Sequence, residues 1–261
     1  MPRTGQPATR LVAAVERAAA VLFELAEAGA ELGTNELARR LELNASTVSR
    51  LLATLAASGL VEHRPESGRY RLGPGLLRLG NAALAQLDLR EVARPQLIAL
   101  SAETGETATL SVPGERDAIT VDFVQSPASV QSVARIGRPS LAHATATGKI
   151  LLAFGRRELP APPLEAFTAR TITDAARLAT EVDRAREQGF AQAAGEREQD
   201  LNAIAAPVLD HRDELAAIVG LQGPASRFDA AAMRAALPAL LARAAAISAA
   251  LGWATSRGHE R

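Results

Sequence analysis

Hydroxyl side chains and an arginine share one face of a predicted helix over residues 46–57, a face suited to binding a nucleic acid. The opposite face is apolar, with Val48, Leu51 and Leu55 at helical spacing. The polar face carries Ser46, Thr47, Ser49, Arg50 and Thr54. Hydroxyls bind phosphates or bases, and a guanidinium binds a guanine edge or a phosphate. We therefore expect these five side chains to face a DNA major groove.

A second basic group follows that helix in the sequence LVEHRPESGRYRLG. It predicts two short strands joined by a turn at Glu66-Ser67-Gly68, because Tyr70 and Leu72 alternate with arginines. We expect Arg64, Arg69 and Arg71 to contact the neighbouring DNA backbone, as a wing does.

The helix before the polar one positions it. We expect Thr34 to be the N-cap of a short helix and a further DNA contact, with Leu37, Ala38 and Leu41 turned inward. A short turn at Glu42 then leads to the polar helix, the spacing of a helix-turn-helix. Residues 1–75 hold nine arginines and eight acids. A helical packing motif with a solvated surface is the alternative.

Elements before and after this motif have periodic signals of their own. Residues 12–28 place Val15, Leu22 and Phe23 on one predicted helical face. A helical pattern begins at Leu76, Asp88 could cap a helix that continues to about Glu103, and Pro95 either kinks that helix or starts a new one.

Beyond residue 105 the pattern alternates between strands and helices. Strands are expected over 106–112, 118–125, 130–137, 190–196, 202–209 and 215–222, and helices over 144–154, 173–188 and 230–251. This half reads as an α+β domain.

Composition excludes several functional classes. The 261 residues are 48% hydrophobic and 22% charged, a globular balance, and 29 basic residues match 29 acidic ones, so any basic surface must be local. The chain has no cysteine, which removes disulfides, thiolate metal sites, iron–sulfur clusters and cysteine nucleophiles. The N-terminal stretch lacks the uninterrupted apolar run of a signal peptide or membrane helix, so we expect a cytoplasmic protein with no membrane partner.

No residue group predicts an enzyme, a metal or a cofactor. The four histidines are scattered without metal-ligand spacing, and nucleophile-elbow and dinucleotide motifs are missing from the sequence. Lys149, the only lysine, lies in ATATGKI, which lacks the ends of a phosphate loop, so we interpret it as structural or surface-exposed. Asp122 is interpreted as a solvated strand residue, and Arg135 and Arg138 as surface residues that could bind an anion.

Over residues 12–252 the sequence resembles the IclR family of bacterial transcriptional regulators. The resemblance rests on eight segments in the same order: VERAAAVLFELAEAG, LARRLELNASTVSRLLATLAASGLVEH, YRLGPGLLRLG, ARPQLIALSAETGETATLSV, HATATGKILLA, REQGFAQAAGE, IAAPVLD and GLQGPASRF. It implies a winged helix-turn-helix domain over 1–75, a linker helix over 76–92 that pairs subunits, and a GAF-like effector-binding domain over 93–261. It also implies a homodimer or dimer of dimers that binds a double-stranded operator and a small-molecule effector.

The resemblance also places the effector pocket. Carried over by position, its lining is Ala146, Thr147, Gly148, Ala193, Ala203, Gly220 and Gln222. Carboxylate-binding relatives have an acid, a cysteine and two serines at the last four of these positions. The substitutions imply a roomier, less polar pocket, and a larger or more apolar effector than a two- or three-carbon acid. Two alternatives stay open: a DNA-binding oligomer without a functional pocket, and an enzyme with its site in the C-terminal domain.

Overall fold

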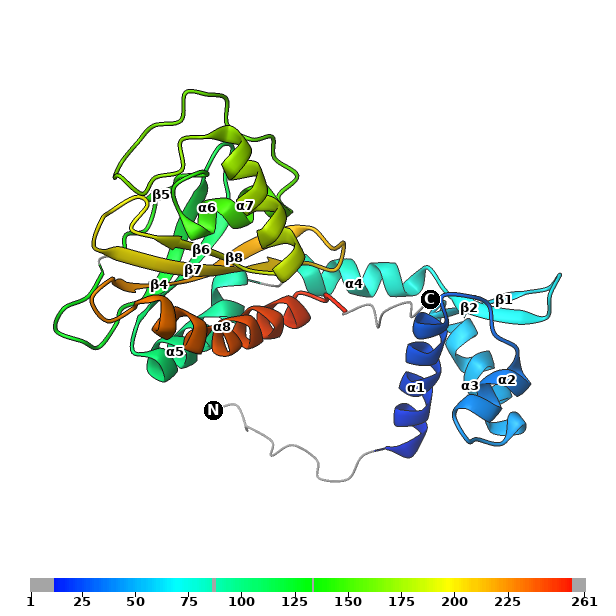
Figure 1. The fold of residues 1–261 in the computed structure, drawn as a ribbon. Helices are drawn as coiled ribbons and strands as arrows, with labels where there is room; N and C mark the ends of the chain where they lie inside the picture. Colours follow the sequence, from blue (N-terminus) through cyan, green and yellow to red (C-terminus); the bar gives the residue numbers. More distant parts are fainter. Residues whose placement is uncertain (1–11, 86–87, 133, 255–261) are drawn as a thin grey trace. The chain divides into compact units, whose positions relative to one another are not determined.

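The computed structural model of the protein describes residues 12–85, 88–132 and 134–254 (Figure 1). The chain divides at residues 86–87 into two compact units. Each unit has its own buried core, and each is described separately below.

The N-terminal unit is a small helical domain with one hairpin. Its elements are α1 (Ala13–Ala28), α2 (Thr34–Arg40), α3 (Ala45–Ala57), β1 (Val61–Arg64), β2 (Arg69–Leu72) and α4 (Gly75–Ala85). The hairpin pairs β1 with β2 in antiparallel register, and Leu32 bridges to Tyr70 beside it. Leu37, Val48 and Leu52 are fully buried where α1, α2 and α3 meet. The predicted helix-turn-helix and hairpin are therefore present.

Two local details differ from the sequence predictions, the N-cap of α2 and the buried face of α1, and the predicted turn at Glu42 has an unusual backbone. Helix α2 begins at Thr34, so its N-cap is Gly33, without a side-chain hydrogen bond. Glu42, in the turn before α3, adopts a left-handed backbone with φ of 53°, a conformation that favours glycine. On α1 the buried residues are Val21 and Leu25, whereas Phe23 is 70% exposed.

The C-terminal unit is built on one antiparallel sheet. Its elements are α5 (Leu89–Thr104), β3 (Thr107–Pro113), β4 (Ala118–Val124), β5 (Pro139–Ser140), α6 (Ala146–Phe154), α7 (Ala175–Gln188), β6 (Ala191–Ala194), β7 (Leu201–Leu209), β8 (Leu215–Pro224) and α8 (Ala230–Ala250). The strand order is β5-β4-β3-β8-β7-β6. In this order β3 and β8 lie at the centre of the sheet, and β5 and β6 lie at opposite edges. Helices α6 and α7 connect β5 to β6 along the chain.

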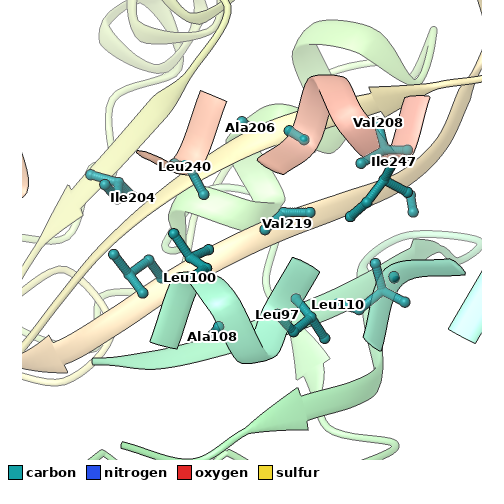
Figure 2. Close-up of a cluster of buried hydrophobic side chains, with 14 of the residues drawn as sticks. Leu97, Leu100, Ala108, Leu110, Ile204, Ala206, Val208, Val219, Leu240 and Ile247 are labelled. Carbon is teal, nitrogen blue, oxygen red and sulfur yellow. The ribbon is translucent and has the colours of Figure 1, made fainter. Parts of the chain in front are cut away.

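Helices cover both faces of this sheet. Helices α5 and α8 pack on one face, where Leu97 and Leu100 of α5 and Ile247 of α8 are buried against β3, β7 and β8 (Figure 2). Helices α6 and α7 pack on the other face through residues that include Ile150, Leu151 and Leu178 (Figure 1). The mixed helix-and-sheet class is thus confirmed.

Several predictions for this half are confirmed, and two are wrong. The Asp88 carboxylate caps α5 by accepting a hydrogen bond from Arg90 N (2.8 Å), and Pro95 lies inside α5 without starting a new helix. The strand predicted over 130–137 is wrong: the described part of that segment is a loop, and only Pro139–Ser140 pairs with β4. Asp122 is buried, not solvated, and its carboxylate accepts a hydrogen bond from Arg94 Nη1 (2.6 Å).

Among the described helices, α8 alone is long and apolar enough, by length and composition, to cross a membrane. Its buried residues include Met233, Leu240 and Ile247, which pack on the sheet. This packing is typical of the core helix of a folded domain.

Candidate nucleic-acid interface and effector cavity

Helix α3 presents the predicted polar side chains to solvent. Ser46, Ser49, Arg50 and Thr54 are exposed, and Thr47 is half-buried. The helix has this orientation because Val48, Leu52 and Leu55 anchor its other side in the core. The hydroxyls and the guanidinium are thus exposed to solvent, while the apolar side chains of the same helix stay buried in the core. Thr34, in the first turn of α2, is half-buried.

The three hairpin arginines are on the surface, but each already has an acidic partner. Arg69 pairs with Glu36 (2.8 Å), and Arg71 pairs with Glu62 across the hairpin (2.7 Å). Arg64 lies 3.6 Å from Glu31. A hydrogen bond from Arg40, with further attraction from Arg40 and Arg69, lowers the pKa of Glu36 below its ordinary value. The hairpin is therefore less positive than its arginines alone suggest.

A cavity lies in the C-terminal unit beside the start of α6. Five of the seven residues predicted for the effector pocket line it: Ala146, Thr147, Ala193, Ala203 and Gln222. They come from α6, β6, β7 and β8, which the sheet order brings together. Residues more than 70 positions apart in the sequence (Ala146 and Gln222) thus share one wall.

The other two predicted residues, Gly148 and Gly220, allow close packing and are not part of the cavity wall. A Cβ at Gly148 would meet the backbone of the preceding loop, 2.6 Å from Ala142 Cα. A Cβ at Gly220 would lie 2.5 Å from Thr109 Oγ1 and 3.4 Å from Thr147 Oγ1. Gly148 therefore lets α6 approach the loop at residues 141–142 closely, and Gly220 leaves room for the hydroxyls of Thr109 and Thr147 beside β8.

Charged residues that the resemblance did not place in the pocket also line the cavity. Arg135 and Arg138, interpreted from sequence as surface residues, come from the loop before β5, and Arg197 and Glu198 come from the loop after β6. Both segments are loops in the structure, and no local sequence signal links either of them to α6. The wall is more polar than the substitutions at the predicted positions imply.

The cavity is small, with a larger basin outside it. Its volume is about 60 Å³, room for roughly four to six water-sized atoms. An adjoining basin of about 770 Å³ shares Arg135, Arg138 and Gln222 with it and adds Ser132 and Asp200. A compact group fits the inner space, and the rest of a ligand would extend into the basin.

A buried ion pair adjoins the cavity, and one of its members, Glu196, lines the wall. Lys149 Nζ donates hydrogen bonds to Glu196 Oε1 (2.7 Å) and to the backbone oxygen of Gln192 (2.9 Å). Lys149 is 1% exposed and Glu196 9% exposed. Burial raises the pKa of the Glu196 carboxyl above its ordinary value, although Lys149 opposes that shift. The structural interpretation of Lys149 agrees with these contacts.

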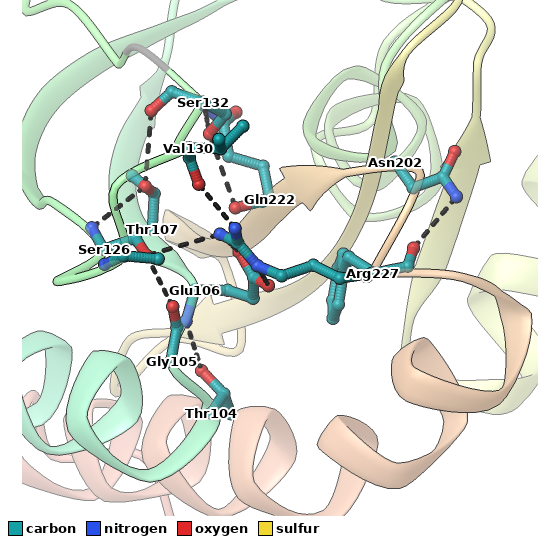
Figure 3. Close-up of polar contacts among 12 residues, drawn as sticks. Thr104, Gly105, Glu106, Thr107, Ser126, Val130, Ser132, Asn202, Gln222 and Arg227 are labelled. Carbon is teal, nitrogen blue, oxygen red and sulfur yellow. Dashed lines mark hydrogen bonds and ion pairs between the residues drawn. The ribbon is translucent and has the colours of Figure 1, made fainter.

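A hydrogen-bond network holds the segment 126–132, which precedes Arg135 and Arg138 in the chain (Figure 3). Gln222 Nε2 donates to Ser132 Oγ (3.0 Å), and Thr107 Oγ1 accepts from the backbone N–H of Ser126 (3.1 Å). Arg227 binds both carboxylate oxygens of Glu106 and donates to the backbone oxygen of Val130 (2.5 Å). Residues 126–132 are thereby tied to β3 and β8. Among the described residues no group of three or more His, Asp or Glu side chains could hold a metal ion.

Two protein-family models match the chain. The model described as "IclR helix-turn-helix domain" matches residues 14–65, and that described as "Bacterial transcriptional regulator IclR C-terminal" matches residues 81–249. Together they cover both compact units.

Individual regulatory proteins also match this chain over nearly its full length. The HTH-type transcriptional regulator XynR of Escherichia coli (strain K12) is 32% identical over 248 residues, 93% of this chain and 98% of the relative. The glycerol operon regulatory protein of Streptomyces griseus is 35% identical over the same shares of each chain. The crystal structure of Pseudomonas aeruginosa HmgR superposes with a TM-score of 0.81 at 30% identity, covering 94% of this chain and 100% of that one.

Proposed function

Because the chain belongs to the IclR family of bacterial transcriptional regulators, we propose that α3 and the β1–β2 hairpin bind an operator and that the cavity beside α6 binds the effector. The protein is a DNA-binding transcriptional regulator, not an enzyme, and its C-terminal domain is of the effector-binding type. The operator contacts, the effector contacts and the oligomer are the parts that we propose.

The exposed polar face of α3 carries the proposal for DNA. It combines hydroxyls with Arg50 on a helix whose other side is fixed in a core. A recognition helix needs polar side chains on its exposed face to contact DNA. It also needs an anchored opposite face, because ordering a flexible helix on binding would cost binding free energy. Thr34 and the hairpin arginines Arg64, Arg69 and Arg71 would add contacts to the phosphates on either side.

Fluorescence anisotropy with the duplex upstream of the protein's own reading frame tests this assignment. We expect tighter binding than to scrambled DNA, and affinity that falls as salt rises. Arg50→Ala should relax base preference, and Arg69→Ala should weaken binding to all sequences equally and reduce the salt slope by about one. Arg177→Ala, an exposed arginine of the C-terminal unit, is the matched control. Unchanged affinity and specificity in both Arg50 and Arg69 variants would refute the assignment.

The cavity wall supports the effector proposal. The start of α6, the ends of β6 and β7, and Gln222 of β8 enclose one space with hydroxyl and charged groups. Pockets that combine apolar surface with a few convergent polar groups are typical ligand sites. A thermal-shift screen tests this function, because a ligand at about 100 times its dissociation constant adds roughly 2.7 kcal/mol of stability. Duplex release by the same compound would link the cavity to regulation.

We propose a homodimer, or a dimer of dimers, in the cytoplasm. Exposed apolar side chains on α1 and α4 support self-association: Val15 is 65% exposed, Phe23 70% and Leu77 70%. Residues 76–92 would serve as the linker between residues 1–75 and 93–261. Light scattering after size exclusion measures the subunit number, and Leu77→Asp should reduce it. A monomer at micromolar concentration would contradict the proposal.

A further inference from the structure

The wall of the cavity carries more positive than negative charge. Its charged residues are three arginines and two glutamates: Arg135, Arg138, Arg197, Glu196 and Glu198. Glu196 is already paired with Lys149 behind the wall. Setting that pair aside leaves three cations against Glu198 alone, a surplus of two positive charges. Asp200 lies in the outer basin and not in the inner wall.

Two of the arginines are poised to accept an anion. Arg197 donates to the backbone oxygen of Pro139 (2.6 Å), and within the described residues no carboxylate lies within 4.0 Å of it. Burial, and next the charge of Arg138, lower the pKa of Arg197 from its ordinary value, so its charged state is disfavoured there. Arg138 pairs with Glu198, whose side chain is 49% exposed and so is weakly held. An anion would stabilise Arg197 and could displace Glu198.

The start of α6 attracts negative charge to another part of the same wall. Thr145, Ala146 and Thr147 form its N-cap and first turn, and all three line the cavity. Thr145 Oγ1 already accepts a hydrogen bond from Gly148 N (2.9 Å), so the first-turn N–H groups left for a ligand are those of Ala146 and Thr147. The helix dipole favours an anion beside them. The start of α6 lines the inner cavity, whereas Arg138 also lines the outer basin. A ligand that extends from one to the other can therefore place an anionic group at each end.

We propose that the effector is a small organic dianion, with one anionic group at the start of α6 and the second bound by Arg138 and Arg197 after Glu198 is displaced. This inference rests on the proposed effector function of the cavity. The second group can be a carboxylate or a phosphate monoester, because a guanidinium binds either in bidentate fashion.

Calorimetric titration of the full-length protein tests the dianion. The probes are succinate and glutarate, each compared with the monoanion of equal carbon number (butyrate and pentanoate), and phosphoglycolate for the phosphate. We expect at least one dianion to bind about tenfold or more tightly than its matched monoanion. Arg138→Gln and Arg197→Gln should each remove most of that preference, whereas Arg234→Gln, on the exposed face of α8, should leave it unchanged.

A gain-of-affinity variant guards against simple misfolding. Glu198→Gln removes the carboxylate that competes for Arg138, so it should strengthen dianion binding more than monoanion binding. The inference is overturned if no dianion binds, if dianions bind no better than monoanions, or if the preference survives in both arginine variants.

The same samples separate this inference from the proposed function. Specific duplex binding without a dianion preference would refute the dianion alone. A dianion preference that depends on Arg138 and Arg197, in a protein that binds no duplex specifically, would refute the operator assignment and support the anion site. Arg197→Lys keeps the charge and should retain part of the preference, which distinguishes charge from shape.

Discussion

Replacing Lys149 by methionine should lower the free energy of unfolding of the C-terminal unit by about 3–5 kcal/mol near neutral pH. Methionine has nearly the length of lysine, so little packing is lost. The change removes the cation that lies 2.7 Å from Glu196 Oε1 and leaves a carboxylate that is only 9% exposed. Glu196 Oε2 has no hydrogen-bond partner among the described residues. The remaining charge would thus be buried without compensation.

The penalty should depend on pH. Burial already raises the folded-state pKa of Glu196 above its unfolded value. A group with a raised pKa contributes stability that is fully present below the unfolded pKa, about 4.3, and is lost as the pH rises through the folded pKa. Without Lys149 the folded pKa rises further. The methionine variant should therefore be more destabilised at about pH 8 than at about pH 5, because a larger fraction of Glu196 is protonated and uncharged at the lower pH.

Urea unfolding followed by tryptophan fluorescence measures this penalty. Trp253 is the only tryptophan in the chain, and its indole donates to Asp213 (2.9 Å) within the C-terminal unit. Adding Glu196→Gln to Lys149→Met should restore most of the stability. Arg184→Met, which breaks an exposed pair with Glu181 (3.0 Å), is the matched control and should cost less than about 1 kcal/mol. A Lys149→Met penalty below about 1 kcal/mol, or one equal at both pH values, would refute the reasoning.

Three further changes test other parts of the fold. Glu42→Gly should stabilise the N-terminal unit by about 1 kcal/mol, because it relieves a left-handed residue with φ of 53°. Thermal unfolding followed by circular dichroism should show a higher melting temperature for the variant. Asp229→Ala should cost about 1 kcal/mol in the Trp253 urea assay, because Asp229 caps α8 with two hydrogen bonds, and Asp229→Asn should cost less. Gly148→Ala should destabilise the same unit and weaken effector binding, because a Cβ there meets the backbone at Ala142 (2.6 Å); a neutral result would contradict the close packing.

Elements with a strong local signal were predictable. Alternation of Tyr70 and Leu72 with arginines identified the hairpin, and helical spacing identified the buried face of α3. Capping chemistry fixed the start of α5 at Asp88. Phe23 shows the limit of such reasoning. Its spacing matches an apolar face, but the residues that α1 buries are decided by α3 and the hairpin, which the period of one helix cannot report.

The cavity was only partly predictable, because it depends on long-range topology. Family resemblance located Ala146 and Gln222, which line the wall. No sequence pattern pointed to Arg197 as a cavity residue. It follows the short strand β6 and lines the wall because β6 lies at the sheet edge near α6. Arg135 lies in the segment 130–137, which was expected to be a strand, and an alternating strand would have turned neighbouring side chains to opposite faces.

Arginine–glutamate pairs recur at both proposed binding surfaces, and under the proposed function they would let a chain with no net charge bind anions. Arg69 with Glu36 on the hairpin and Arg138 with Glu198 at the cavity are partly exposed pairs. Such pairs contribute only about 0–1 kcal/mol each, so a phosphate or an effector can replace the glutamate at little cost. In the free protein the glutamates would then mask the arginines and weaken non-specific anion binding. Specificity then depends on whether an incoming anion also reaches a second group, the exposed face of α3 in one case and the start of α6 in the other.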